Sequence, residues 1–143
     1  MLYRNRPKNF NPEFEAVGCF CEYDGKILLL LRQDHKPEPN TWGLPGGKLA
    51  AGEDIYQGMR RELKEETDLN GEEIKYISKA YSRFFKYDFI YHIFHLALAE
   101  LPKIIIDESE HKDFIWVTPD EALKIDLIEN LDKCIEIVYG KEN

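Results

Sequence analysis

Two apolar runs joined by an Asp-Gly pair constrain the fold of this chain most strongly. Residues 16–23 and 26–31 are dominated by apolar side chains, and Asp24-Gly25 lies between them. An Asp-Gly pair between apolar runs suits the two-residue turn of a β-hairpin. The chain is therefore predicted to build its core around a sheet, with this hairpin near its start.

A segment rich in proline and glycine follows, from residue 35 to residue 52. It contains three prolines and the Gly46-Gly47 pair, which exclude a helix and predict an irregular loop of the kind that often carries function. The Gly-Gly pair also lets the backbone approach a metal or a phosphate closely, because no side chain intervenes. Residues 54–67 then combine strong helix formers with an acidic start, so we expect a helix directly after the loop.

The second half of the chain is expected to contain further strands and a helical end. Three segments rich in β-branched and aromatic residues are predicted strands, namely 74–85, 89–99 and 114–117. The second of these segments has apolar residues at both odd and even positions, so both of its faces are expected to be buried, which predicts a central position in the sheet. Thr118-Pro119 is typical of a helix start, so residues 122–139 are expected to be mostly helical. These elements predict one α/β domain over residues 1–143, with a mixed sheet flanked by helices.

Composition and charge narrow the classes of partner. With 143 residues, of which 43% are hydrophobic, the chain has the size of one domain with a full core. Its 27 acidic and 19 basic residues give a net charge of −8, which disfavours long nucleic acid as a partner. No apolar run approaches the roughly 20 residues that span a bilayer, and the N-terminus does not resemble a secretory signal, so we expect a cytoplasmic protein without membrane contact. The three cysteines have the spacing of neither a zinc knuckle nor a redox motif and are predicted to be small buried hydrophobes.

Charged residues on the apolar face of the predicted helix give the first indication of chemistry. At about 100° per residue, the apolar side chains fall in one arc of the helix, which holds Ile55, Met59 and Leu63. Glu62 and Glu66 fall in the same arc, and Glu65 lies at its margin. Glutamate-rich helices usually present a solvated face, and that interpretation stays open. Partly buried carboxylates this close together repel one another, however, and a divalent cation such as Mg²⁺ or Mn²⁺ would resolve the conflict.

The segment from the Gly-Gly pair through this helix resembles a known family motif. Residues 47–69 read GKLAAGEDIYQGMRRELKEETDL, which is similar to the Nudix box G-x5-E-x7-R-E-U-x-E-E-x-G-U, where U is aliphatic. Every defined position but one matches, and residues 42–46 resemble the usual lead-in. The departure is Asp68, where the family has a glycine that ends the helix in a left-handed conformation. Aspartate tolerates that conformation, so we expect only a modest cost in stability.

The resemblance implies the Nudix fold, a mixed sheet between helices in an α/β/α sandwich, and metal-dependent hydrolysis of a phosphoanhydride bond in a small nucleotide-like substrate. Four groups are then expected to hold one or more Mg²⁺ ions, with Mn²⁺ as a substitute: Glu62, Glu65, Glu66 and the carbonyl of Gly46. Arg61 is expected to pair with Glu53 and brace the loop against the helix. A glutamate of the helix cluster would deprotonate a metal-bound water, although members of the family differ in which glutamate acts.

A later loop is expected to add a carboxylate to this site. Residues 108–116 resemble the segment that supplies it in the family, and Glu110 is our candidate. An ordinary solvated acid is the alternative, because other acidic residues lie nearby. His111 beside it either contacts a phosphate or has no role in the site.

Substrate preference is expected to come from residues outside the box. Aromatic and arginine side chains suit a base or a phosphate, and the candidates are Arg32, Trp42, Arg83, Phe85 and Tyr87. Ordinary packing or a solvated surface is the alternative for each of them. A nucleoside triphosphate is the expected substrate, with dinucleoside polyphosphates, nucleotide sugars and dihydroneopterin triphosphate as alternatives. A Nudix-fold sensor that binds a nucleotide without cutting it is the non-enzymatic alternative, and a homodimer is common in the family.

Two further features carry weaker signals. His92 and His95 are an odd number of residues apart, which places them on opposite faces of a strand and argues against a second metal site. Arg4, Arg6 and Lys8 form a basic arm, which is either an ordinary terminus or a contact for phosphates in a neighbouring subunit.

Overall fold

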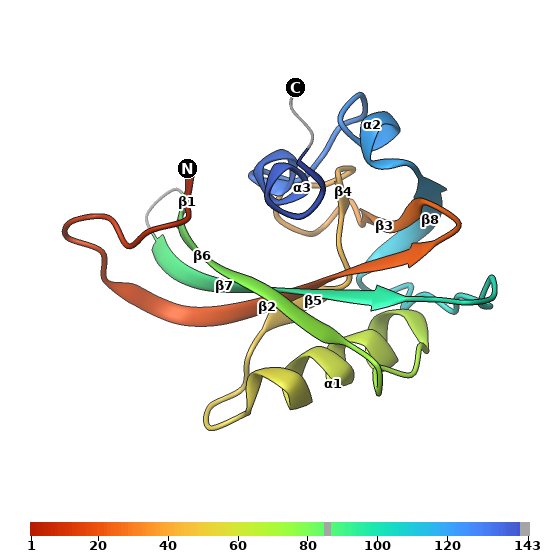
Figure 1. Cartoon of the computed structure of the whole chain (residues 1–143), viewed down its shortest axis with the longest axis horizontal. Helices are drawn as coiled ribbons and strands as arrows, with labels where there is room; N and C mark the ends of the chain where they lie inside the picture. Colours follow the sequence, from red (N-terminus) through yellow and green to blue (C-terminus); the bar gives the residue numbers. More distant parts are fainter. Residues whose placement is uncertain (85–86, 141–143) are drawn as a thin grey trace.

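The computed structural model of the protein describes residues 1–84 and 87–140. Its elements are, in chain order, β1 (Leu2–Tyr3), β2 (Pro12–Tyr23), β3 (Lys26–Arg32), β4 (Trp42–Gly43), β5 (Gly46–Lys48), α1 (Ile55–Thr67), β6 (Lys75–Phe84), β7 (Tyr87–Ala97), β8 (His111–Val117), α2 (Pro119–Ala122) and α3 (Leu131–Tyr139). Figure 1 shows the long strands crossing the middle of the molecule between α1 and α3.

The predicted hairpin is present as β2 and β3. Tyr23 pairs with Lys26 across it, and Asp24 and Gly25 form the turn with φ angles of 50° and 76°. Both turn residues adopt the positive φ that this kind of tight turn requires. β2 continues beyond β3 on its N-terminal side and pairs there with β5 and β7, so it links the hairpin to the rest of the sheet.

Within the described residues, eight strands form one mixed sheet. Its main order is β1-β6-β7-β2-β3-β4, while β5 pairs with β2 and β8 pairs with β3. β2 and β7 are parallel, whereas β2 is antiparallel to β3 and β5. β7 lies between β6 and β2, which confirms the central position predicted from its apolar pattern.

Helices cover both faces of the sheet, which confirms the predicted sandwich (Figure 1). On one face Met59 and Leu63 of α1 are fully buried in a core that includes Phe94. On the other face Ile135 of α3 is fully buried in a second core with Phe20. Burying one such side chain stabilises the fold by about 1.5–3 kcal/mol. No helix in the described part of the chain is long and apolar enough to cross a bilayer.

The three cysteines are free and buried, as predicted. Cys19 and Cys21 lie in the core beneath α1, and Cys134 is a residue of α3 that is buried in the other core. They therefore act as small apolar side chains in this structure.

The predicted helix over residues 122–139 is wrong in its first half. The structure has the single turn α2 and then α3, with irregular chain between them. That chain pairs with β4, because the amide of Trp42 donates to the carbonyl of Asp126 and the amide of Ile128 donates to the carbonyl of Trp42, each at 2.9 Å. This tertiary pairing replaces the helical hydrogen bonds that the local sequence favours.

Several strand boundaries also differ from the prediction. The proline- and glycine-rich loop contains the short strands β4 and β5, because its backbone pairs with β3 and β2. β7 spans Tyr87–Ala97 rather than residues 89–99, and β8 begins at His111 rather than at residue 114. In both strands, backbone pairing with a neighbour continues past the apolar residues that marked the strand in the sequence.

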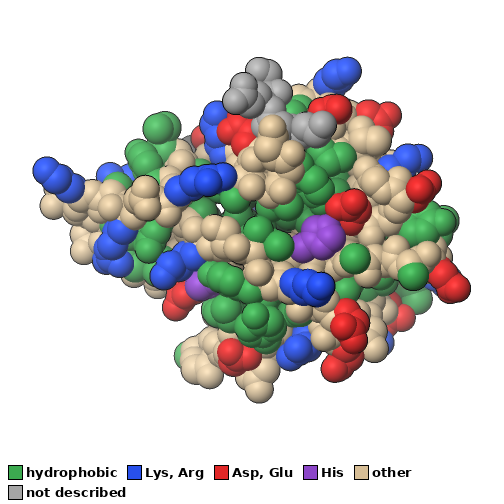
Figure 2. Space-filling view, viewed as in Figure 1, with side chains coloured by type: hydrophobic (Ala, Val, Ile, Leu, Met, Phe, Trp, Pro, Cys, Tyr) green, Lys and Arg blue, Asp and Glu red, His purple; other side chains and the backbone are tan. Residues whose placement is uncertain are grey.

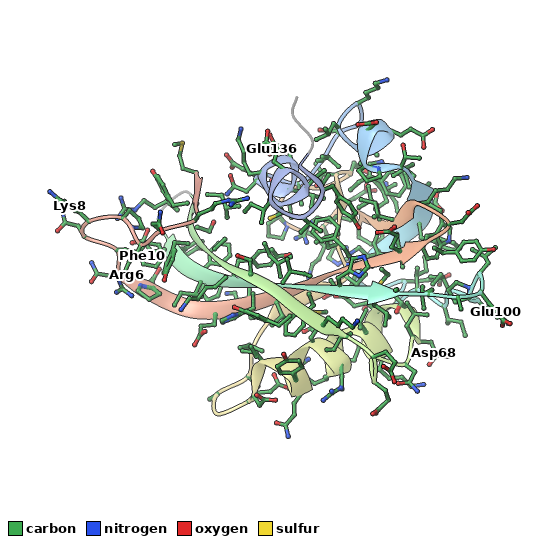
Figure 3. The ribbon with its side chains drawn as sticks, viewed as in Figure 1. Arg6, Lys8, Phe10, Asp68, Glu100 and Glu136 are labelled. Carbon is green, nitrogen blue, oxygen red and sulfur yellow. The ribbon has the colours of Figure 1, made fainter. Side chains whose placement is uncertain are left out.

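The N-terminal arm lies at one end of the molecule. Figure 3 places Arg6 and Lys8 there, on the segment between β1 and β2, far from Asp68 at the end of α1. Figure 2 shows basic side chains gathered at the same end. Phe10 is buried, and Arg83 donates two hydrogen bonds of 2.9 and 2.8 Å to backbone carbonyls of the arm. The arm is therefore tied to the sheet away from the C-terminal end of α1.

Candidate active site

Caps at both ends of α1 position the carboxylates of the predicted site. Asp54 caps the N-terminus, where its side chain accepts a hydrogen bond of 3.3 Å from the amide of Gln57. At the other end Asp68 has a φ of 63°, and its amide donates to the carbonyl of Lys64 at 3.1 Å. Aspartate thus adopts the left-handed conformation predicted for this position, and its side chain also pairs with Lys64 at 2.6 Å. The caps set the ends of α1, and the burial of Met59 and Leu63 turns the face that carries Glu62 and Glu66 toward the sheet.

Glu62 and Glu66 lie on the buried face of α1. They are 8% and 5% exposed, which confirms the inward orientation predicted from the helical periodicity. Burial raises the pKa of Glu62. Burial also raises the pKa of Glu66 to about 9, reinforced by the nearby charge of Glu62 and opposed by a hydrogen bond from Gly46. Two such carboxyl groups keep a proton between them near neutral pH unless a cation takes its place.

The glycines of β5 lie directly against these carboxylates. The amide of Gly46 donates to Oε1 of Glu66 at 2.9 Å. A Cβ on Gly47 would lie 2.8 Å from Oε1 of Glu62, and one on Gly46 would lie 2.0 Å from the carbonyl oxygen of Val17. A side chain at either position would displace a carboxylate or the backbone of β2. The Gly-Gly pair therefore permits the close contact between β5 and α1.

Arg61 joins the loop before α1 to the helix. Its Nε and Nη2 donate to the two carboxylate oxygens of Glu53 at 2.8 and 3.0 Å, so the predicted ion pair is present. Nη2 also donates to the carbonyl of Lys48 at 3.3 Å, and Nη1 donates to Glu62 at 3.1 Å. The hydrogen bonds from Arg61 lower the pKa of Glu53 to about 2, and the same pairing raises the pKa of Arg61. One guanidinium group thus contacts the loop and a buried carboxylate.

Glu65 differs from its two neighbours on the helix. Its side chain is 53% exposed, as the marginal position on the helical wheel predicts. Both of its carboxylate oxygens accept hydrogen bonds from Nη1 of Arg61, at 3.2 and 3.3 Å. An exposed pair of this kind contributes little to stability, so Glu65 can exchange Arg61 for another cation at small cost.

The loop before β8 brings Glu110 to the same region. Its charge contributes to the raised pKa of Glu66, and its Oε2 pairs with Nζ of Lys36 at 2.5 Å. His111 is 6% exposed, and its Nδ1 has no hydrogen-bond partner among the described residues. Burial, followed by the positive charge of Arg32, lowers the pKa of His111 to about 4, so its imidazole is neutral at physiological pH.

The donor set of this region fits a divalent cation. Glu62 and Glu66 are buried carboxylates with raised pKa values, and the Arg61 guanidinium that pairs with Glu62 also pairs with Glu53. Oxygen ligands from adjacent helical turns suit Mg²⁺ or Mn²⁺. Within residues 1–84 and 87–140, no three Asp, Glu, His or Cys side chains are already arranged to hold a metal ion. Arg61 holds Glu65 and Lys36 holds Glu110, so these two acids would have to change partner to join such a site.

Two of the predicted substrate-binding residues lie on the side of the sheet near β3 and β4. Arg32 ends β3, and its Nε donates to the carbonyl of Pro37 at 2.7 Å, close to His111. Trp42 is half-buried against the second core and forms a bridge with Leu127. Arg32 thus lies beside the carboxylate region, whereas Trp42 has a packing role in this structure.

Two other candidates lie at the far end of the sheet. Arg83 pairs with Asp88 at 3.1 Å and also donates to the N-terminal arm, and Tyr87 is 48% exposed. Asp88 pairs with Pro12 of β2, whereas Gly46 pairs with Gly18, six residues further along the same strand. That separation is about 20 Å along β2, so these side chains and the glutamates do not form one cluster. Phe85 lies outside the described residues.

The two histidines of β7 face opposite sides of the sheet, as predicted. His92 bonds to the hydroxyl of Tyr76 at 2.9 Å and to Glu15 at 2.5 Å. His95 bonds to Glu22 at 3.0 Å, on the face that α3 covers. Each histidine belongs to its own polar network, so the pair does not form a common metal site.

The region that carries these carboxylates matches one known protein family. The model of the NUDIX domain matches residues 12–136 of the chain. The chain belongs to the Nudix family. It is therefore a hydrolase of the class that cleaves pyrophosphate bonds, as the predicted box indicates.

Nudix proteins of known activity resemble the chain over most of its length. The CTP pyrophosphohydrolase of Escherichia coli (strain K12) is 30% identical over 115 residues, which are 79% of this chain and 82% of the relative. The ADP-ribose pyrophosphatase of Bacillus subtilis (strain 168) is 33% identical over 116 residues, which are 77% of this chain and 61% of the relative. The crystal structure of a MutT protein from Methanosarcina mazei Go1 matches with a TM-score of 0.78 at 22% identity, covering 88% of this chain and 92% of the other, and supports the fold alone.

Two residues near the site were not predicted from the sequence. A Cβ on Gly18 would lie 1.7 Å from the hydroxyl oxygen of Tyr91. The missing side chain at Gly18 therefore leaves room for Tyr91 against β2, the strand that pairs with β5. A glycine inside an apolar strand is a usual sign of such close packing, and this signal was present. Lys36 has no comparable signal, because its partner Glu110 is 74 residues away in the chain.

Proposed function

We propose that this Nudix hydrolase is a Mg²⁺-dependent pyrophosphohydrolase that converts a nucleoside triphosphate into the nucleoside monophosphate and pyrophosphate. The observation that carries the proposal is the buried pair of Glu62 and Glu66, one turn apart on α1, of which Glu66 accepts a hydrogen bond from Gly46 of β5. Two buried carboxylates are costly without a compensating cation, and a polyphosphate needs that cation for its cleavage. The likeness to the CTP pyrophosphohydrolase of Escherichia coli supports a triphosphate substrate.

The side chains have distinct parts in the proposed reaction. When bound, Mg²⁺ would neutralise phosphate oxygens and activate a water for attack on phosphorus. The groups proposed to hold it are Gly46, through its carbonyl, and the carboxylates of Glu62, Glu65, Glu66 and Glu110. Arg61 keeps Glu62 in place by pairing with both Glu62 and Glu53. A glutamate of this set accepts the proton of the attacking water.

ADP-ribose is the second candidate substrate. The ADP-ribose pyrophosphatase of Bacillus subtilis is 33% identical to this chain, and the same carboxylate set would serve its diphosphate. The two candidates differ in products, because a triphosphate yields pyrophosphate whereas ADP-ribose yields AMP and ribose 5-phosphate.

A substrate panel tests the proposal. The purified protein is incubated with nucleoside triphosphates, ADP-ribose, dinucleoside polyphosphates, other nucleotide sugars and dihydroneopterin triphosphate, with Mg²⁺ or with EDTA, and the products are identified by chromatography. We expect the highest kcat/KM for a nucleoside triphosphate, pyrophosphate as the second product, and no turnover in EDTA. Release of orthophosphate from triphosphates, a higher kcat/KM for ADP-ribose, or undiminished turnover in EDTA would contradict the proposal.

A further inference from the structure

Two loops from opposite halves of the chain are joined beside the glutamates of α1. The loop after β3 carries Gln33 and Lys36, and the loop before β8 carries Glu108 and Glu110. The amide of Gln33 donates to the carbonyl of Glu110 at 3.1 Å, and its side chain donates to the carbonyl of Glu108 at 2.8 Å. These bonds bring Nζ of Lys36 to Oε2 of Glu110, at 2.5 Å. The lysine is therefore held at the edge of the carboxylate region by the backbone around it.

Charges of both signs meet at this junction, where Glu110 and Asp107 face Arg32 and Lys36 around His111. Arg32 and Lys36 both act electrostatically on the imidazole of His111, which is 6% exposed and whose Nδ1 has no partner within the described residues. Glu110 is the acid that pairs with Lys36, and its charge also acts on Glu66. Glu110 thus lies between a cationic group of side chains and the buried carboxylates of the site.

The ion pair between Lys36 and Glu110 is suited to exchange. Its side chains are 27% and 37% exposed, so solvent already reaches both charges. A cation bound by the helix glutamates would attract Glu110, and Lys36 would then need another anion. An ammonium group with three rotatable donors is a common ligand for phosphate oxygens.

We propose that Lys36 determines substrate specificity, because it exchanges its ion pair with Glu110 for a contact with the terminal phosphates of the substrate. This proposal rests on the triphosphate substrate proposed above. Lys36 then neutralises the pyrophosphate that leaves, and Glu110 becomes free to face the metal. ADP-ribose has a diphosphate closed at both ends by ribose and offers no terminal phosphate to Lys36. The exchange therefore favours triphosphates over ADP-ribose.

The chain contains a matched control for this contact. Lys112, the second residue of β8, pairs at 2.8 Å with Asp34 of the loop after β3, and the Asp34 side chain is 76% exposed. Removing the charge of Lys112 removes an ion pair between the same two parts of the chain without touching Glu110. Lys36→Gln and Lys112→Gln therefore separate a role in the site from a role in joining the loops.

The test compares the wild type with Lys36→Gln, Lys36→Arg and Lys112→Gln in two measurements. The first is the KM for CTP and for ADP-ribose in Mg²⁺. Loss of a charge-assisted contact predicts that Lys36→Gln raises the KM for CTP by about tenfold or more, with little change for ADP-ribose. Lys36→Arg should restore most of the affinity for CTP, and Lys112→Gln should match the wild type. Thermal unfolding checks that each variant is folded.

The second measurement is Mn²⁺ binding without nucleotide, followed by electron paramagnetic resonance. Lys36→Gln should bind Mn²⁺ several-fold more tightly than the wild type, because Glu110 is released and a positive charge is removed. A role limited to joining the loops predicts equal or weaker binding.

Three results would overturn the role of Lys36. They are an equal rise in both KM values, a KM for CTP in Lys36→Gln that equals that of Lys112→Gln, and Mn²⁺ binding by Lys36→Gln that is equal to or weaker than that of the wild type. In each of these cases a wild type that hydrolyses CTP leaves the proposed function intact. Where the substrate panel shows that another nucleoside triphosphate is preferred, that nucleotide replaces CTP in these measurements. A wild type that hydrolyses no nucleoside triphosphate overturns both the proposed function and this inference.

Discussion

The backbone amide of Gly46 donates a hydrogen bond of 2.9 Å to Oε1 of Glu66 and so joins β5 to the last turn of α1. Gly47, the next residue, leaves no room for a side chain beside Glu62. The metal-binding face proposed for α1 therefore depends on the backbone of the preceding strand as much as on the glutamates.

Gly47→Ala should damage the site more than the fold. The added Cβ would lie 2.8 Å from Oε1 of Glu62, so this carboxylate must move. A displacement of this size predicts a fall in kcat of between about ten- and a hundredfold, and overpacking predicts a loss of about 1–3 kcal/mol in the free energy of unfolding. Steady-state kinetics and urea unfolding measure the two effects.

Gly43→Ala is the control for that substitution, because its Cβ would meet Ile128 at an ordinary contact distance of 3.4 Å. It should keep most of the activity. Equal kcat values for Gly47→Ala and Gly43→Ala would show that Glu62 need not lie against the β5 backbone.

The pair of Arg61 and Glu53 should lose its stabilising effect in acid. Arg61 lowers the folded-state pKa of Glu53 to about 2, from an ordinary value of 4.5. A lowered pKa stabilises the fold above the ordinary value, and that contribution is lost as the pH falls from 4.5 toward 2. The Tm of Glu53→Gln should lie below that of the wild type by a constant amount between pH 5 and 7, and the gap should narrow below pH 4.5.

Glu72→Gln provides the reference for this titration, because Glu72 is an exposed acid away from Arg61. Its Tm should follow that of the wild type at every pH. A gap for Glu53→Gln that is unchanged at pH 3 would mean that the ion pair does not stabilise the folded protein.

Without a divalent cation, the protein should become less stable as the pH rises. Burial raises the pKa of Glu66 to about 9, so the folded state keeps a proton that the unfolded chain releases near pH 4.5. The unfolded state binds fewer protons in this window, so the free energy of unfolding should fall as the pH rises from 5 to 9 in EDTA. Mg²⁺ should reduce this slope, because it replaces the proton.

Thermal unfolding of the wild type and of Glu66→Gln, each in EDTA and in Mg²⁺, measures this effect. The amide of glutamine does not titrate, so the variant should have a flatter profile and a weaker response to Mg²⁺. The same slope in both proteins would assign the pH dependence to another group.

The pattern of the sequence predicted the elements that depend on interactions between residues close together in the chain. The periodicity of residues 54–67 predicted both α1 and the burial of Glu62 and Glu66, because one helix determines which of its side chains share a face. The Asp24-Gly25 turn was predicted for the same reason. The resemblance to the Nudix box predicted the ion pair of Arg61 with Glu53, which spacing alone did not indicate.

Contacts between distant segments account for what the sequence did not predict. The chain between α2 and α3 is not helical because it pairs with Trp42, a residue more than 80 positions earlier. Lys36 meets Glu110 only because two loops are joined by backbone hydrogen bonds. Arg83 was chosen for its chemistry, yet its donors bind Asp88 and the N-terminal arm. The homodimer, the cytoplasmic location and the choice of the general base stay predictions.

Pyrophosphate release from CTP by Glu66→Gln in Mg²⁺ directly tests the proposal that the buried glutamates of α1 form the catalytic metal site. We expect a kcat at least about a hundredfold below that of the wild type, with a Tm that shows a folded protein, because a buried carboxylate needed by the metal is gone. Glu108→Gln, an exposed acid of the loop before β8, should keep wild-type turnover. Wild-type turnover by a folded Glu66→Gln would contradict the assignment of the buried glutamates of α1 as the catalytic metal site.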